Sequence, residues 1–166
     1  LKTRLEKVTE TVDGSSNTYA KVSSNSVNII FKTISANGTI TTGRLAAVNT
    51  DAAKNYSYLD MSKSDVDGNE DPFYTVMTNK PDALKLKVNF KVGKRSSGNS
   101  NINALASAYI TDEKEFHDPD ITYTNYVANI NYEIPNTNDA WQELTLPFSY
   151  KSGAKESPKA LLVTLS

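Results

Sequence analysis

Apolar and polar residues alternate along much of the chain, which is the pattern of half-buried β-strands. In residues 84–92, five apolar side chains alternate with lysines and an asparagine; they are Leu84, Leu86, Val88, Phe90 and Val92. Successive side chains of a strand point to opposite faces of its sheet, so this run predicts one face in the core and one in water. Helical periodicity is nearly absent, and the charges and threonines of residues 1–12 argue against a stable helix there.

Similar patterns predict strands over residues 101–111, 123–134, 141–150 and 160–165. Pro147 cannot donate to a strand ladder, so it predicts an edge position or a bulge in its strand. Trp141 opens the same strand, and we expect its large side chain to pack in the core. The last strand is expected at the edge of a sheet, unless a further strand follows it in the natural protein.

The remaining segments complete the expected architecture. Residues 27–34 and 40–48 are predicted to pair as a hairpin around Asn37-Gly38, because Asn-Gly between apolar runs is a strong hairpin signal. Residues 1–25 are expected to form an N-terminal extension or an edge strand. Residues 50–80 lack strand periodicity and are expected to form an ordered surface loop over one edge of the sandwich. The whole pattern predicts a single all-β domain over residues 1–166, an antiparallel β-sandwich or jelly roll.

Composition narrows the classes of function. With 18 Lys and Arg residues against 19 Asp and Glu residues, the chain has no basic stripe, so we expect no nucleic-acid binding. Cysteine is absent, which excludes thiolate metal sites and cysteine nucleophiles. No apolar run approaches the roughly 20 residues of a membrane-spanning helix, so a membrane-spanning chain is not expected.

The residue types that could support catalysis are not arranged for it. His117 is the only histidine, and its neighbour Asp118 would point to the opposite side of an extended chain. The sequence therefore predicts that His117 lies in a surface turn. Glycoside hydrolysis needs two carboxylates opposed across a cleft, whereas Glu113 with Glu115, and Asp118 with Asp120, are near neighbours in a loop. We therefore expect no enzymatic activity.

A metal site is considered in the acidic segment before residue 72. Oxygen ligands alternate there as in a calcium loop, at Asp65, Asp67, Asn69 and Asp71. The match to an EF-hand fails, because Gly68 is misplaced for the turn and Val76 stands where the bidentate glutamate belongs. A hydrated acidic loop without a cofactor is favoured over bound calcium.

Aromatic residues supply the candidate ligand contacts, because exposed rings can stack on the pyranose rings of sugars. Residues 50–80 carry Tyr56, Tyr58, Phe73 and Tyr74, and Tyr123 and Tyr126 near His117 could serve in the same way. In an extended segment Tyr56 and Tyr58 project to one side, while Phe73 and Tyr74 point to opposite sides. We predict that Tyr58 and Tyr74 contact a glycan.

Several segments, in their order along the chain, resemble a known family. The more specific ones are Lys80-Pro81-Asp82-Ala83-Leu84-Lys85 and W-Q-E-L-T-L-P-F-S-Y at residues 141–150; weaker ones are Thr42-Gly43-Arg44-Leu45 and Asp71-Pro72-Phe73-Tyr74. Over roughly residues 40–166 the chain resembles the PCMD family, a carbohydrate-metabolism domain of exported Bacteroidetes proteins. The resemblance implies a β-sandwich similar to carbohydrate-binding modules, without established catalytic residues, and with a further C-terminal strand that this sequence does not contain.

Pattern and resemblance together favour a non-catalytic, carbohydrate-binding-like accessory domain of a secreted or cell-surface bacterial protein, with a glycan as partner. The first alternative is a structural or adhesive surface domain that contacts protein partners. The second alternative, less favoured, is a glycoside hydrolase. Because sandwiches host many functions, fold analogy alone does not choose among these three.

Overall fold

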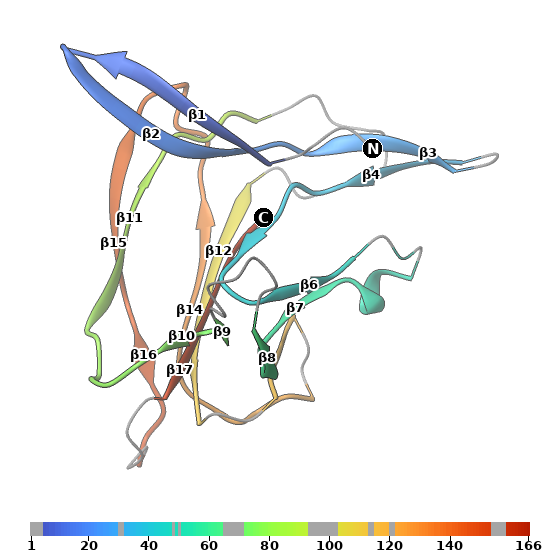
Figure 1. Ribbon diagram of the computed structural model, residues 1–166, viewed down its shortest axis with the longest axis vertical. Coiled ribbons are helices and arrows are strands. Elements are labelled where there is room, and N and C mark those ends of the chain that lie inside the picture. Colours follow the sequence, from blue (N-terminus) through green and yellow to red (C-terminus); the bar gives the residue numbers. More distant parts are fainter. Residues whose placement is uncertain are drawn as a thin grey trace. The chain divides into compact units, whose positions relative to one another are not determined.

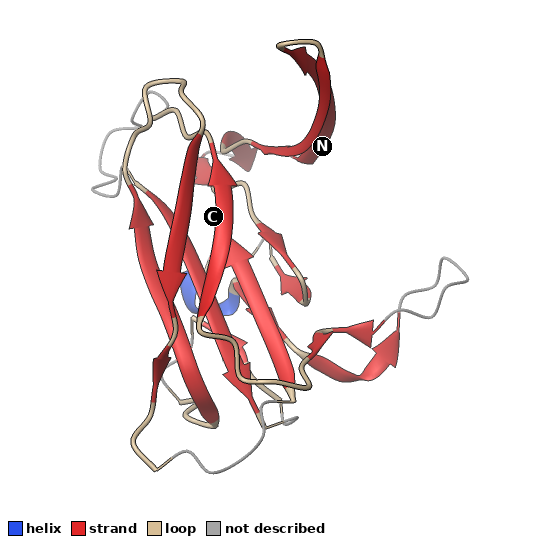
Figure 2. Ribbon diagram, turned by 90° about the vertical axis from the view of Figure 1, so that its left-hand side faces the viewer, coloured by secondary structure: helices blue, strands red, loops and turns tan. Residues whose placement is uncertain are grey.

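The computed structural model describes residues 5–29, 32–47, 49, 51–64, 72–92, 103–112, 115–119, 122–153 and 159–166. Within these residues nearly every regular element is a strand, and the one helical element is the 3₁₀ turn η1 (Ala52–Lys54) (Figure 2). The predicted all-β class is confirmed. The described part contains no helix that is long and apolar enough to cross a membrane.

The chain forms two compact units. Among the described residues, those up to Ile40 together with Ser166 belong to the first unit, and those from Thr41 to Leu165 belong to the second. That residues 1–166 form one domain stays a prediction.

In the first unit, β1 (Leu5–Val12) pairs with β2 (Ser15–Val22) as an antiparallel hairpin. Its two-residue loop is Asp13-Gly14, with φ angles of 50° and 77°. Positive φ at both central residues is the requirement of a type I′ turn, which matches the twist of the flanking strands. The segment predicted as an N-terminal extension or an edge strand, residues 1–25, therefore contains both strands of a local hairpin.

A second antiparallel pair joins β3 (Asn25–Ile29) to β4 (Lys32–Ala36), so the hairpin predicted around Asn37-Gly38 is wrong. Gly38 instead allows a close approach of the backbone. A Cβ atom at this position would lie 2.5 Å from the carbonyl oxygen of Ser23, which is too close for any side chain. The Asn-Gly signal reflects this close approach and not a turn between two paired strands.

The second unit is built on a central antiparallel sheet (Figure 1). Its strands follow the order β10 (Thr75–Val76), β17 (Ala160–Leu165), β12 (Ala104–Thr111), β14 (Tyr126–Ile134) and β16 (Ser149–Tyr150). The last strand of the chain, β17, thus lies between β12 and β10. The edge position expected for it is wrong.

β5 (Ile40–Thr41) also pairs with β17, along the edge of β17 that does not pair with β12. The Thr42 N–H donates to the carbonyl oxygen of Val163 at 3.0 Å, and the Thr41 and Thr164 hydroxyls lie 3.3 Å apart. These contacts tie the start of the second unit to its last strand.

One face of the central sheet is covered by an antiparallel ribbon of two strands, β11 (Ala83–Val88) and β15 (Gln142–Pro147). The core between these layers contains Ala106, Ala108, Ile110, Ala128, Ile130, Ile134, Leu146 and Phe148. Leu84, Leu86 and Val88 pack against it while Lys85 and Lys87 are exposed, which confirms the alternation predicted for this strand. The alanines of β12 bring the two layers close together, as small side chains should.

The strand predicted over residues 141–150 divides at Pro147. Before this residue β15 pairs with β11, and after it β16 pairs with β14 of the central sheet. The Phe148 N–H donates to the carbonyl oxygen of Asp82 at 2.9 Å. Pro147 has no N–H to donate, so the division falls where the ladder loses a donor.

The other face of the central sheet is covered by short strands. β6 (Arg44–Ala46), β7 (Tyr56–Tyr58) and β13 (His117–Asp118) form one sheet, and β8 (Asp60–Ser64) pairs with β9 (Pro72–Phe73). The buried core beneath them contains Leu59, Phe116, Ala160 and Leu162. Figure 1 shows this layer and the β11–β15 ribbon on opposite sides of the central sheet. The second unit therefore has three layers.

These short strands overturn the prediction that residues 50–80 form a surface loop. Gly43 shows how closely the layer is packed, since a Cβ atom there would lie 2.3 Å from the carbonyl oxygen of Tyr58 and 2.6 Å from Leu162 Cδ1. Only a residue without a side chain fits between β7 and the central sheet at this point.

Candidate functional site

The strongest candidate site lies on the outer face of the β6–β7–β13 sheet. The strand register places Arg44 opposite Tyr58, and Tyr58 opposite His117. Directly opposed residues project to the same face, so these three side chains form a row across the sheet. Tyr56 lies two residues before Tyr58 on the same face, and Tyr123 reaches the site from the segment before β14. We call Tyr56, Tyr58, His117 and Tyr123 the aromatic cluster.

His117 is at the centre of the aromatic cluster. Its ring centroid lies 4.2 Å from that of Tyr56, with an interplanar angle of 12°, and 4.2 Å from that of Tyr123, with an angle of 27°. The Tyr58 ring meets it edge-on at 5.7 Å, and His117 Nε2 lies 2.9 Å from Glu115 Oε1. The side chain of His117 is only 12% exposed, so the predicted surface turn is wrong. The pairing of β13 with β7 carries the ring into the cluster.

Arg44 forms one margin of the cluster. Its Nη1 donates to Asp60 Oδ2 at 2.9 Å, and its guanidinium carbon lies 5.0 Å from the centroid of Phe73 and 6.0 Å from that of Tyr58. The Arg44 side chain is 36% exposed, whereas that of Asp60 is 12% exposed. The ion pair and the rings hold the guanidinium in place while the side chain stays partly exposed to solvent.

Asp118 anchors β13 from the inner side of the layer. The Ser107 hydroxyl, on β12, donates to Asp118 Oδ2 at 2.5 Å, and the Tyr109 hydroxyl also hydrogen-bonds this carboxyl group. Burial raises the pKa of Asp118. Burial, with the nearby charge of Asp118, also raises the pKa of Tyr109 to about 12. Because successive residues of a strand point to opposite faces, Asp118 cannot orient the His117 ring as it would in a catalytic pair.

The two predicted glycan contacts fall in different surroundings. Tyr58 belongs to the aromatic cluster and is partly exposed, with its ring centroid 5.8 Å from that of Tyr56. Tyr74 packs against the core of Leu59 and Phe116. As expected, Tyr56 and Tyr58 share a face. The structure does not bring Tyr58 and Tyr74 together in one cluster.

Sequence reasoning missed His117 and Arg44 as partners of the tyrosines. A strand of two residues such as β13 shows no alternation, so the sequence predicts a turn at His117. Arg44 carried no signal of its own, because it reaches Tyr58 only through the pairing of β6 with β7. Tyr123 is one of the two further candidate rings that the sequence offers near His117, and the structure places it in the aromatic cluster.

The candidate calcium ligands belong to a segment that the structure does not describe. Asp65, Asp67, Asn69 and Asp71 lie outside the described residues, so the hydrated loop and the calcium site both stay predictions. Glu113 and Asp120 lie outside them as well. The described part of the chain contains no group of three or more His, Asp or Glu side chains that could hold a metal ion.

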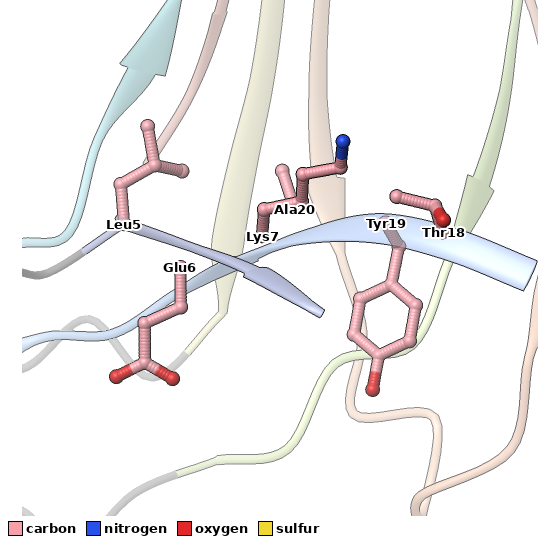
Figure 3. A pocket seen from close by; sticks show the side chains of 6 residues that line it. All are labelled: Leu5, Glu6, Lys7, Thr18, Tyr19 and Ala20. Atoms are coloured by element: carbon pink, nitrogen blue, oxygen red, sulfur yellow. The ribbon is translucent and has the colours of Figure 1, made fainter. Parts of the chain in front are cut away.

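A depression on the β1–β2 hairpin is a weaker candidate (Figure 3). It is lined by Leu5, Glu6, Lys7, Thr18, Tyr19 and Ala20. Figure 3 shows Glu6 and Tyr19 on one side of the ribbon and Leu5 and Thr18 on the other. Side chains that leave a two-stranded ribbon on both of its faces cannot enclose a ligand, so this depression does not define a small-molecule site.

No family model matches the chain, and comparison with curated proteins and with solved structures gives no match. The resemblance to the PCMD family therefore stays a prediction.

Proposed function

We propose that this protein is a non-catalytic, carbohydrate-binding-like accessory domain of a secreted or cell-surface bacterial protein. It would hold a glycan against the aromatic cluster. The observation that carries the proposal is the row of Arg44, Tyr58 and His117, completed by Tyr56 and Tyr123.

The chemistry of the cluster suits a sugar. A pyranose ring has an apolar face that packs on aromatic side chains, and hydroxyl groups at its rim that need donors and acceptors. The cluster offers partly exposed rings beside the Arg44 guanidinium and the Glu115 carboxylate. Because the rings contact one another and Arg44 is held by Asp60, the surface is preorganised, which lowers the entropic cost of binding.

The positions of the titratable side chains support binding over catalysis. His117 packs between two tyrosines, whereas Asp118 lies on the opposite, buried side of β13. A hydrolase needs an acid and a base directed at one bond, and these two side chains point away from each other.

A glycan array followed by calorimetric titration tests the proposal. With the best glycan from the array, Tyr58→Ala should weaken binding about tenfold, since loss of a stacking ring costs about 1–2 kcal/mol. Tyr58→Phe keeps the ring and should bind within about threefold of the parent protein. Tyr74→Ala is the matched tyrosine control and should lower the melting temperature with little effect on affinity, because Tyr74 packs on the core.

A silent array, or unchanged affinity in Tyr58→Ala, would contradict the proposal. Turnover of the bound glycan by the parent protein would contradict its non-catalytic part. The measurement for turnover is the release of reducing ends over time, with His117→Ala as the comparison.

A further inference from the structure

One edge of β14 is only partly covered by a neighbouring strand. Along its other edge β14 pairs with β12 over nearly its whole length, whereas β16 pairs with it only at Ala128 and Asn129. None of the described strands pairs with this outer edge over residues 130–134. Backbone groups left along a strand edge are a template for pairing with a strand of another chain.

The backbone of this stretch presents hydrogen-bonding groups to the outer edge. The Val127 carbonyl oxygen accepts from the Lys151 N–H at 2.9 Å, on the side of β16, so this carbonyl points to the outer edge. Along an antiparallel strand, successive residues direct their N–H and C=O groups alternately to the two sides. Asn131 and Glu133 therefore direct theirs to the same outer edge as Val127. Both side chains are exposed.

The sequence of the free stretch complements itself. Residues 130–134 read Ile-Asn-Tyr-Glu-Ile, which is symmetric about Tyr132 in its apolar positions. When a second copy pairs antiparallel about a two-fold axis at Tyr132, Asn131 faces Glu133 of the second copy, and Glu133 faces its Asn131. An amide donor then meets a carboxylate acceptor in two places, and the outward backbone groups of these residues form hydrogen-bonded pairs.

Neighbouring registers are less favourable. With the axis at Asn131, Glu133 would stand opposite Asn129 of the second copy, a position that Ser149 of β16 already fills. With the axis at Glu133, the two Glu133 carboxylates would stand opposite each other, and like charges in this position are destabilising. The axis at Tyr132 avoids both conflicts.

The length of the free stretch also fits a second copy. β14 ends at Ile134, and Pro135 follows with no N–H to extend a ladder. In the pair, Ile134 of the second copy stands opposite Ile130, one residue before the position opposite Asn129 where β16 begins to pair. The added strand thus fills the free stretch without displacing β16.

We infer that two copies of this protein pair through residues 130–134 of β14 and form a two-fold symmetric dimer with one continuous sheet. The axis of such a pair is perpendicular to the sheet, so corresponding faces of the two copies lie on one side. The dimer itself does not depend on the proposed function. Combined with that function, it presents two aromatic clusters on the same side, and a glycan that spans both gains avidity.

Sedimentation velocity of the full chain measures the association. The contact is small, so we expect a dissociation constant of about 100 μM and a sedimentation coefficient that rises between about 10 μM and about 1 mM protein. Asn131→Glu sets a carboxylate opposite each Glu133 and should weaken the dimer about fivefold, whereas Asn131→Lys sets an ammonium there and should strengthen it about fivefold. Lys54→Gln, on η1, changes the net charge by the same amount as Asn131→Glu and should leave the dissociation constant unchanged.

Disulfide trapping tests the register, because the chain has no cysteine of its own. On the axis, the Cα atoms of Tyr132 in the two copies form a non-hydrogen-bonded pair about 4.5 Å apart, within the range of a disulfide. Tyr132→Cys should therefore form a covalent dimer under mild oxidation. Asn131→Cys is offset by two residues from Asn131 of the second copy, beyond that range, and should stay monomeric over the same time.

The fluorescence of Trp141 follows the stability of each variant. Trp141 is 38% exposed and is not part of the buried core, so its predicted core position is wrong, but most of its surface is covered and unfolding should change its emission. If Asn131→Glu melts at a lower temperature than the parent, Asn131→Lys provides the comparison.

A dimer that Asn131→Glu weakens and Asn131→Lys strengthens, with trapping in Tyr132→Cys alone, supports the inference. A parent protein that stays monomeric up to about 1 mM overturns it. Equal trapping of Tyr132→Cys and Asn131→Cys, or equal effects of Asn131→Glu and Lys54→Gln, overturns it as well. These outcomes are independent of glycan binding, because no glycan is present in any of the measurements.

Discussion

Replacing Phe116 by alanine tests whether the layer that carries the aromatic cluster is packed on the central sheet. Phe116 is 2% exposed, and its ring centroid lies 4.7 Å from that of Tyr109, 6.1 Å from that of Tyr126 and 6.2 Å from that of Tyr123. Phe→Ala in a protein core costs about 3–5 kcal/mol of the free energy of unfolding. The ring also loses contacts with three tyrosines, so we expect a cost of about 4 kcal/mol.

Urea denaturation measures this cost. With a slope of about 2 kcal/mol per molar urea, the midpoint should fall by about 2 M while the slope stays constant. Phe73→Ala is the matched control, because Phe73 is half-buried beneath the Arg44 guanidinium and should cost only about 1 kcal/mol. Equal costs for the two variants, both near 1 kcal/mol, would refute the reasoning. Phe116 would then not be a core residue, and the third layer would not be packed as described.

The remaining predictions concern the same region. Gly43→Ala should lower the free energy of unfolding by about 1–3 kcal/mol, because its Cβ would lie 2.3 Å from the Tyr58 carbonyl oxygen and 2.6 Å from Leu162 Cδ1. Thermal melting measures this loss. An unchanged melting temperature would contradict the close approach of Gly43 to Tyr58 and Leu162. Burial raises the pKa of Asp118 above its ordinary value of 3.8. The stability that this group contributes is therefore complete below about pH 4 and is lost as the pH rises through the raised pKa. Asp118→Asn should remove this decline from urea midpoints measured against pH. In an absorbance titration of tyrosine ionisation, a step near pH 12 should disappear in Tyr109→Phe, and its survival would assign it to another residue.

The long strands could be predicted from the sequence because they alternate over enough residues to be recognised. β11 shows the leucine–lysine alternation of a strand with one solvent-exposed face. β12 shows alanines on one side and Tyr109 on the other. β12 is covered on both faces, so what alternates along it is the kind of side chain and not the exposure. In β11 the pattern comes from contact with a core on one face only. Neighbouring positions then differ in polarity, which a period of two residues reveals.

The candidate site could be predicted only in part, because short strands built by distant pairing form it. β7 has three residues and β13 has two, too few to show any period. Arg44 and His117 are far apart in sequence, and they come to lie on either side of Tyr58 only because β6 and β13 flank β7. The residue type of Tyr58 suits stacking and so predicts a ligand contact, but nothing in the local sequence distinguishes it from the core-packed Tyr74.

The division of one strand between two layers at Pro147 has a consequence for how the protein opens. β15 belongs to the ribbon and β16 to the central sheet, with the Phe148 N–H bonded to the Asp82 carbonyl oxygen between them. The ribbon cannot lift away from the core without pulling β16 from β14. Amide hydrogens of β11, β15 and β14 should therefore exchange with solvent at similar rates, in one cooperative step. A ligand held on either side of the central sheet would slow that same step.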